Sequence, residues 1–137
     1  MKNSELSDRD KNFVLQCQLN DAAIEGDIER ISSLLSQGVD VHAHDDEILL
    51  HAARANAVRT FEFFASCNIE MDIFDDLVIH VAMESKSMKV IKFLIEHSAI
   101  IGRELNPEGS YKNQFTEIKN SIYEKRLLEA DFKKNHL

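Results

Sequence analysis

Two histidines beside carboxylates are the residues of this chain whose types and spacing could do chemistry. His42 and His44 are followed directly by Asp45 and Asp46. On an extended segment both imidazoles would lie on the same side, next to a carboxylate, and could together ligate a metal ion. The spacing fixes no third ligand, and the carboxylates are also suited to cap the helix that follows. We favour the capping interpretation and predict no metal and no cofactor.

The remaining nucleophiles and bases do not form a catalytic pattern. Cys17 and Cys67 lack a ligand spacing, and we expect both thiols to stay reduced in a cytosol-like compartment. The sequence has no serine or cysteine placed with a base, no glycine-rich phosphate loop and no zinc motif. We therefore predict that the protein is not an enzyme.

Composition favours an acidic, helical protein of one domain. The 137 residues include only 4 glycines and 1 proline, too few for the turns of a sandwich, a barrel or a Rossmann sheet. The net charge is −8 without a basic stripe, so we expect no nucleic acid as a partner. No apolar run is long enough for a membrane span or a signal peptide, so we expect no membrane partner either. The expected location is cytoplasmic, or a host cytoplasm if the protein is a delivered effector.

A pattern that recurs every 30 residues organises the chain. Residues 22–45 read AAIEGDIERISSLLSQGVDVHAHD: small residues, a turn at Gly26, an amphipathic helix, a glycine stop and an extended exit. This predicts a helical hairpin, which cannot bury its apolar faces alone and must stack on copies of itself. Equivalent positions are Ala22, Ala52 and Ala82 for the small residues, and Gly38 and Asn68 for the stop.

These units resemble ankyrin repeats, whose sequence is roughly T-P-L-H-x-A-A-x-x-G, an amphipathic helix and G-A-D-V-N-A. The likeness is carried by AAIEGDIERISSLLSQGVDVHA and, more loosely, by LLHAARANAVRTFEFFASCNIEMD and VIHVAMESKSMKVIKFLIEHSAI, over about residues 17–101. The chain differs in its period of 30 against the usual 33, in lacking the Thr-Pro start, and in replacing Gly26 by Asn56 and Lys86. The resemblance implies an all-α, ankyrin-like helical-hairpin solenoid with N- and C-terminal capping helices.

Three parts are expected along the chain. Residues 1–18 would form an N-terminal capping helix with Ser7 as its N-cap, and Phe13, Val14 and Cys17 would lie on one face of it. Three repeats would follow at about residues 19–45, 46–75 and 76–102, within residues 19–102. Residues 103–137 would form a C-terminal helical cap or arm.

The last part differs from the rest in charge and in pattern. Residues 1–102 hold 18 acids and 9 bases, whereas residues 103–137 hold 6 acids and 7 bases. After a turn at residues 106–110, the stripe Phe115, Ile118 and Ile122 is expected to cover the third repeat, and the segment as a whole to cover Ile100 and Ile101. The apolar positions then shift to Leu127, Leu128 and Phe132, which requires a bend near residues 123–126 or a second partner. We favour a monomer, with a dimer through residues 111–132 as the alternative.

The resemblance implies a non-catalytic module that binds another protein through the inner helix face and short loops. The implied contact positions are Ile24, Glu25, Arg54 and Glu84 at helix ends, and His44, Asp46, Glu47, Phe74, Asp76 and Leu77 in the loops. Phe74 is expected to be an exposed anchor, or alternatively to pack sideways on its neighbours. Acidic loops favour a partner with a basic surface. An adaptor or scaffold is the first hypothesis; the alternative is a small acidic inhibitor, an immunity-type protein or a secreted effector that blocks a basic target enzyme.

Overall fold

The secondary structure of the described chain is all α-helical, as predicted. The computed structural model describes residues 7–67, 69–107 and 109–135, and within them no residue is in a strand. Asn68, expected to end a helix, lies outside the described residues, as does Glu108 in the turn at 106–110. The helices are α1 (Asp8–Glu25), α2 (Ile28–Ser36), α3 (Ala43–Arg54), α4 (Val58–Ser66), α5 (Asp76–Glu84), α6 (Met88–Ile100) and α7 (Tyr111–Asn135).

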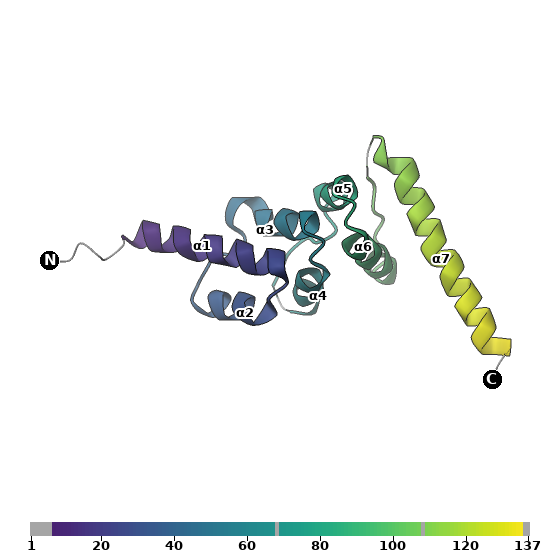
Figure 1. The fold of residues 1–137 in the computed structure, drawn as a ribbon, viewed down its shortest axis with the longest axis horizontal. Helices are drawn as coiled ribbons and strands as arrows, with labels where there is room; N and C mark the ends of the chain where they lie inside the picture. Colours follow the sequence, from purple (N-terminus) through teal and green to yellow (C-terminus); the bar gives the residue numbers. More distant parts are fainter. Residues whose placement is uncertain (1–6, 68, 108, 136–137) are drawn as a thin grey trace.

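The helices form an elongated molecule with α1 at one end and α7 at the other (Figure 1). Consecutive helices pair as α1 with α2, α3 with α4, and α5 with α6. The first helices of the pairs also contact one another in the order α1, α3, α5 and then α7, and the second helices contact in the order α2, α4, α6. No helix in the described part of the chain combines the length and apolarity needed to cross a bilayer.

The turn inside each pair recurs with the expected period of 30. Gly26, Asn56 and Lys86 all adopt a left-handed backbone, with φ of 67°, 56° and 56°. After each of them one backbone N–H closes the same turn at 2.9 Å: Asp27 to Ala22, Ala57 to Ala52, and Ser87 to Ala82. The second helices accordingly begin at residues 28, 58 and 88. The 30-residue period is therefore a property of the backbone as well as of the sequence.

Small side chains allow the first helices to approach closely. Ala22, Ala52 and Ala82 are fully buried, as are Ala23 and Ala53. Around them lies a single apolar core whose fully buried large side chains include Leu19, Ile31, Phe61, Ile79, Ile91 and Leu94. The equivalent small residues of the 30-residue pattern thus all lie in the core.

Two polar side chains join neighbouring pairs. The buried Thr60 Oγ1 on α4 donates to the carbonyl of Ala23 at the end of α1, at 2.6 Å. Asn56 Oδ1, in the turn before α4, accepts the backbone N–H groups of Lys89 and Val90 at 3.0 and 3.2 Å. The first turn of α6 is thus capped by a side chain from the preceding pair.

At the N-terminus the expected capping helix and the first repeat helix form one helix, α1. Ser7 is its N-cap, as predicted, and its hydroxyl accepts the N–H of Asp10 at 3.2 Å. Phe13 is 70% exposed, Val14 is 41% exposed and Cys17 is exposed, so the expected apolar cap is not buried. The amino-terminal half of α1 is therefore largely solvated, although Leu15 within it packs partly against the core.

At the C-terminus α7 is a single helix from Tyr111 to Asn135, so of the two alternatives for its distal part the bend near residues 123–126 is not the one observed. Phe115 is 5% exposed, and Ile118 and Ile122 pack partly against the core, which confirms that this stripe covers the stack. Arg126 Nη2 donates to Glu96 Oε2 of α6 at 2.6 Å. Beyond this contact Leu127, Leu128 and Phe132 are 68%, 70% and 62% exposed.

The expected covering of Ile100 and Ile101 is wrong. These side chains are 76% and 59% exposed at the end of α6. After α6 the next buried side chains are Leu105 and Phe115, at 7% and 5% exposure. These two residues therefore pack into the core, and Ile100 and Ile101 remain in solvent.

Candidate functional site

The first turn of α3 is left-handed and strained rather than extended. His44, Asp45 and Asp46 have φ of 56°, 56° and 61°, a left-handed turn that costs an L-residue about 1–2 kcal/mol each. The expectation of an extended segment with His42 and His44 on one side is therefore wrong. His42 Nδ1 instead pairs with Asp46 Oδ1 at 2.6 Å. Within the described residues, no group of three or more His, Cys, Asp and Glu could hold a metal ion.

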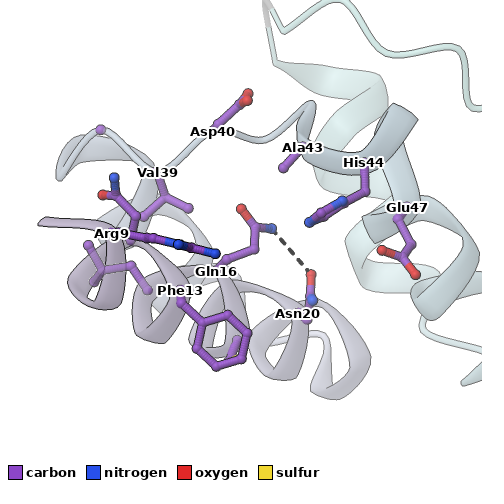
Figure 2. A pocket seen from close by; sticks show the side chains of 13 residues that line it. Arg9, Phe13, Gln16, Asn20, Val39, Asp40, Ala43, His44 and Glu47 are labelled. Atoms are coloured by element: carbon purple, nitrogen blue, oxygen red, sulfur yellow. Dashed lines mark hydrogen bonds between the residues drawn. The ribbon is translucent and has the colours of Figure 1, made fainter. Parts of the chain in front are cut away.

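Residues 38–47, which lead into and begin α3, and the solvated half of α1 line an open pocket of about 470 Å3 (Figure 2). From α1 come Arg9, Phe13, Gln16 and Asn20, and from the loop and α3 come Val39, Asp40, Ala43, His44 and Glu47. Gln16 Nε2 donates to Asn20 Oδ1 at 3.4 Å, which orients two amides along the pocket. The ring of His44 points toward the α1 side of the pocket.

The pocket combines an apolar wall with charges of both signs. Phe13 is 70% exposed at its edge, and Leu15 and Val39, which also line it, are partly buried. Glu47 brings a carboxylate and Arg9 a guanidinium, whereas the carboxylate of Asp40 accepts the N–H of His42 at 2.9 Å and points away from the other labelled side chains in Figure 2. The pocket can therefore cover an apolar side chain and pair with a neighbouring positive charge.

Cys17 also lines this pocket, so a thiol and the imidazole of His44 share one cavity. An activated cysteine needs a base within hydrogen-bonding reach of its sulfur. No hydrogen bond joins these two side chains in the described structure, and Cys17 is an exposed free thiol. Cys17 and His44 therefore line the same pocket without forming a hydrogen-bonded nucleophile and base.

The loop before α5 differs from the expectation at Phe74. Its side chain is partly buried and packs against the core, so it is not the exposed anchor that was expected. Asp75 is the N-cap of α5 and accepts the N–H of Leu77 at 2.9 Å. Leu77 itself is 52% exposed and Asp76 is exposed.

Arg103 partly neutralises this second loop, a feature that sequence reasoning missed. Its guanidinium donates to both carboxylate oxygens of Asp72, at 2.7 and 2.8 Å. That hydrogen-bonded pair raises the pKa of Arg103 above its ordinary value, and the nearby charges of Asp76 and Asp75 act in the same direction. The acidity of the loop at residues 72–76 is therefore offset, whereas no arginine or lysine pairs with the loop at 42–47 within the described structure.

The other predicted contact residues lie at the opposite ends of the first helices. Ile24 is 41% exposed and Glu25 is exposed at the end of α1, where Glu25 pairs with Arg30 at 3.2 Å. Arg54 ends α3 and Glu84 ends α5, and both are exposed. His44, Asp46 and Glu47 lie at the start of α3. The predicted positions thus form two groups, and only His44 and Glu47 among them line the pocket with α1.

No protein-family model matches this chain, and neither a curated protein nor a solved structure matches it.

Proposed function

We propose that the chain is a non-catalytic protein-binding module that takes a segment of a partner protein into the pocket between α1 and residues 38–47. The observation that carries this proposal is Phe13, which is 70% exposed at the edge of an open cavity of about 470 Å3. Covering apolar surface gains about 25 cal/mol for each Å2 removed from water. Aromatic anchors at pockets are the residues that most often dominate the free energy of an interface.

The charges of the pocket favour a partner segment in which an apolar side chain stands next to a basic one. Glu47 lines the pocket, and Asp40 adds a second carboxylate at its rim, beside the single positive charge of Arg9. The net charge of −8 would also speed the encounter with a basic surface. Asp46 contributes less, because it is already paired with His42 at 2.6 Å.

We further propose that the three helix pairs are shortened ankyrin-like repeats that stack as a solenoid, in a monomer that acts in a cytoplasmic compartment. The support for the repeats is the left-handed turn that recurs every 30 residues, together with the side-chain bonds from Thr60 and Asn56 to neighbouring pairs. The support for the compartment is that Cys17 and Cys67 are both free thiols.

A second candidate function is the inhibition of a basic enzyme, favoured by the excess of carboxylates on the pocket and by the net charge. An inhibitor of this kind would depend mainly on charge, whereas an adaptor would depend mainly on Phe13. The two functions therefore predict different sensitivity to salt.

The test is a binding titration of the full chain with a partner captured from its source organism. If the pocket is the site, Phe13→Ser should weaken binding at least tenfold, because anchor residues contribute about 2 kcal/mol or more. Glu47→Lys should weaken binding in dilute salt, and its effect should shrink at about 0.5 M salt, where screening is strong.

Leu127→Ser is the matched control, because Leu127 is 68% exposed on α7 and lies outside the pocket. Circular dichroism and thermal melts of all three variants should be unchanged. Full affinity in both pocket variants would refute this assignment of the site. Loss with Glu47→Lys alone, abolished by salt, would favour the inhibitor over the adaptor.

A further inference from the structure

Residues 42–47, the first segment, and residues 72–77, the second segment, are equivalent points of the 30-residue pattern but differ in backbone. Asp75 has φ −57° and ψ 140° and accepts the N–H of Leu77 at 2.9 Å as the N-cap of α5. Asp45, its equivalent, has φ 56° and lies inside α3, whose N-cap makes no side-chain bond. Equivalent segments therefore adopt two conformations within one chain.

The residue types explain why the two segments differ. The left-handed turn is made of His44, Asp45 and Asp46, and histidine and aspartate enter the left-handed region more often than most L-residues. The second segment has Phe74 in place of His44, and a positive φ is an outlier for a residue of that bulk. The first segment can therefore adopt either backbone, whereas the second is restricted to one.

A contact across the turn holds the left-handed conformation. His42 Nδ1 lies 2.6 Å from Asp46 Oδ1, and the N–H of Asp46 donates to the carbonyl of His42 at 3.3 Å. The second segment has Asp72 in place of His42, and this acid would repel Asp76 and is paired with Arg103 instead. The contact is thus possible in the first segment and not in the second, and it offsets part of the backbone strain.

We infer that the turn at residues 44–46 is a two-state switch that reshapes the pocket at α1. The turn is left-handed while His42 and Asp46 are paired, and it relaxes when they separate. In the relaxed state Asp45 caps α3 in the way that Asp75 caps α5. A capping bond then replaces the His42–Asp46 pair, so neither state is left without a side-chain contact.

The two states present different walls to a bound segment. In the left-handed state the ring of His44 points toward α1, and Glu47, directly after the turn, also lines the pocket (Figure 2). In the relaxed state His44 takes the place that Phe74 has in the second segment, against the core. A partner that contacts His44 in the pocket selects the left-handed state, and relaxed chains weaken its apparent affinity. This control of binding rests on the proposed function, whereas the two states of the turn do not.

The test is nuclear magnetic resonance of the isotope-labelled full chain without a partner. A residue with positive φ gives a strong cross-peak between its own amide and α protons, so residues 44–46 should each show one. Asp46→Ala removes the bond to His42 and disfavours the left-handed region, so it should shift the ratio of the two states at least about fivefold and weaken these cross-peaks. Amide shifts should move at residues 42–48 and on the pocket side of α1 within residues 13–20.

Three further variants separate the switch from a loss of charge. Asp46→Asn removes the same charge but keeps a side chain that tolerates the left-handed region and can bond His42, so the cross-peaks should remain. Asp76→Ala makes the equivalent change in the second segment and should leave residues 44–46 as they are. Asp45→Gly favours the left-handed turn and cannot cap α3, so the cross-peaks on either side of it should stay strong.

Unchanged cross-peaks in Asp46→Ala, or equal losses in Asp46→Ala and Asp46→Asn, would overturn the proposal. Circular dichroism should show that every variant is folded. With the partner captured from the source organism, Asp46→Ala should weaken binding and Asp46→Asn should not. If Phe13→Ser weakens binding and Asp46→Ala does not, the turn does not control the pocket. If neither variant weakens binding, the proposed function fails, while the two states measured in the free chain stand.

Discussion

The three equivalent turns make a test of what one side chain contributes at a left-handed position. Gly26, Asn56 and Lys86 share the same backbone conformation. The glycine is unstrained there, whereas Lys86 has a Cβ that disfavours the left-handed region. Asn56 has the same backbone but also caps α6 through its bonds to Lys89 and Val90. Replacing Asn56 and Lys86 by glycine therefore separates backbone strain from capping.

The expected magnitudes follow from the two effects. Lys86→Gly should stabilise the protein by about 1 kcal/mol. The change removes backbone strain of about 1–2 kcal/mol, and part of this gain is offset because glycine raises the conformational entropy of the unfolded chain. Asn56→Gly relieves less strain, since asparagine tolerates this region, and it loses a cap of about 1 kcal/mol. The net change should be destabilising by up to about 1 kcal/mol. Asn56→Ala should cost about 1–3 kcal/mol, because it loses the cap and keeps a Cβ.

The assay is urea unfolding followed by circular dichroism, with thermal melts as a second measurement. A change of 1 kcal/mol should move the melting temperature of a chain of this length by about 3–5 °C. The m-value should stay constant, since none of the changes alters the surface buried. If Lys86→Gly and Asn56→Gly shift stability in the same direction by the same amount, the bonds from Asn56 to α6 contribute nothing and the reasoning fails.

Three further predictions concern the core. Ala52→Leu, at a fully buried helix contact, should destabilise by about 1–3 kcal/mol through overpacking, and an unchanged urea midpoint would contradict the close approach of these helices. Phe115→Ala should cost about 3–5 kcal/mol, whereas Leu127→Ala on the exposed part of α7 should change stability by less than about 0.5 kcal/mol; equal losses in urea unfolding would mean that α7 is not anchored by Phe115. Ser87→Ala should leave stability unchanged or raise it by about 1 kcal/mol, because this buried hydroxyl has no hydrogen-bond partner in the described structure; a clear loss on thermal melting would show that the hydroxyl is satisfied in solution.

What the sequence predicted well was set by short-range signals. The helix pairs recur every 30 residues because small residues, a left-handed turn residue and an amphipathic run each act within a few positions. The N-cap at Ser7 is an equally local signal. The burial of Phe115 followed from helical periodicity alone.

What the sequence missed depends on contacts between distant residues. Arg103 forms an ion pair with Asp72, which is 31 residues away in the sequence. Neither segment contains a local pattern that predicts this pair. The exposure of Phe13 depends on how far α1 extends beyond the helices it contacts, which its own periodicity does not specify. The burial of Phe74 likewise depends on neighbours outside its loop. Asp45 and Asp46 were expected to cap the helix that follows, but they lie in a left-handed turn at the start of α3, whose N-cap His42 makes no side-chain capping bond.

The hydrogen bonds from the middle pair, α3 and α4, to its neighbours also determine which helices unfold first in local unfolding. Thr60 holds this pair to the one before it, and Asn56 holds it to the one after it, so both outer pairs depend on the middle one. In native-state hydrogen exchange, the slowest amides should therefore lie in α3 and α4, with protection falling outward in both directions. Fraying at either end then costs only part of the total unfolding free energy. A partner that holds one end would slow exchange there and leave the far end as it was.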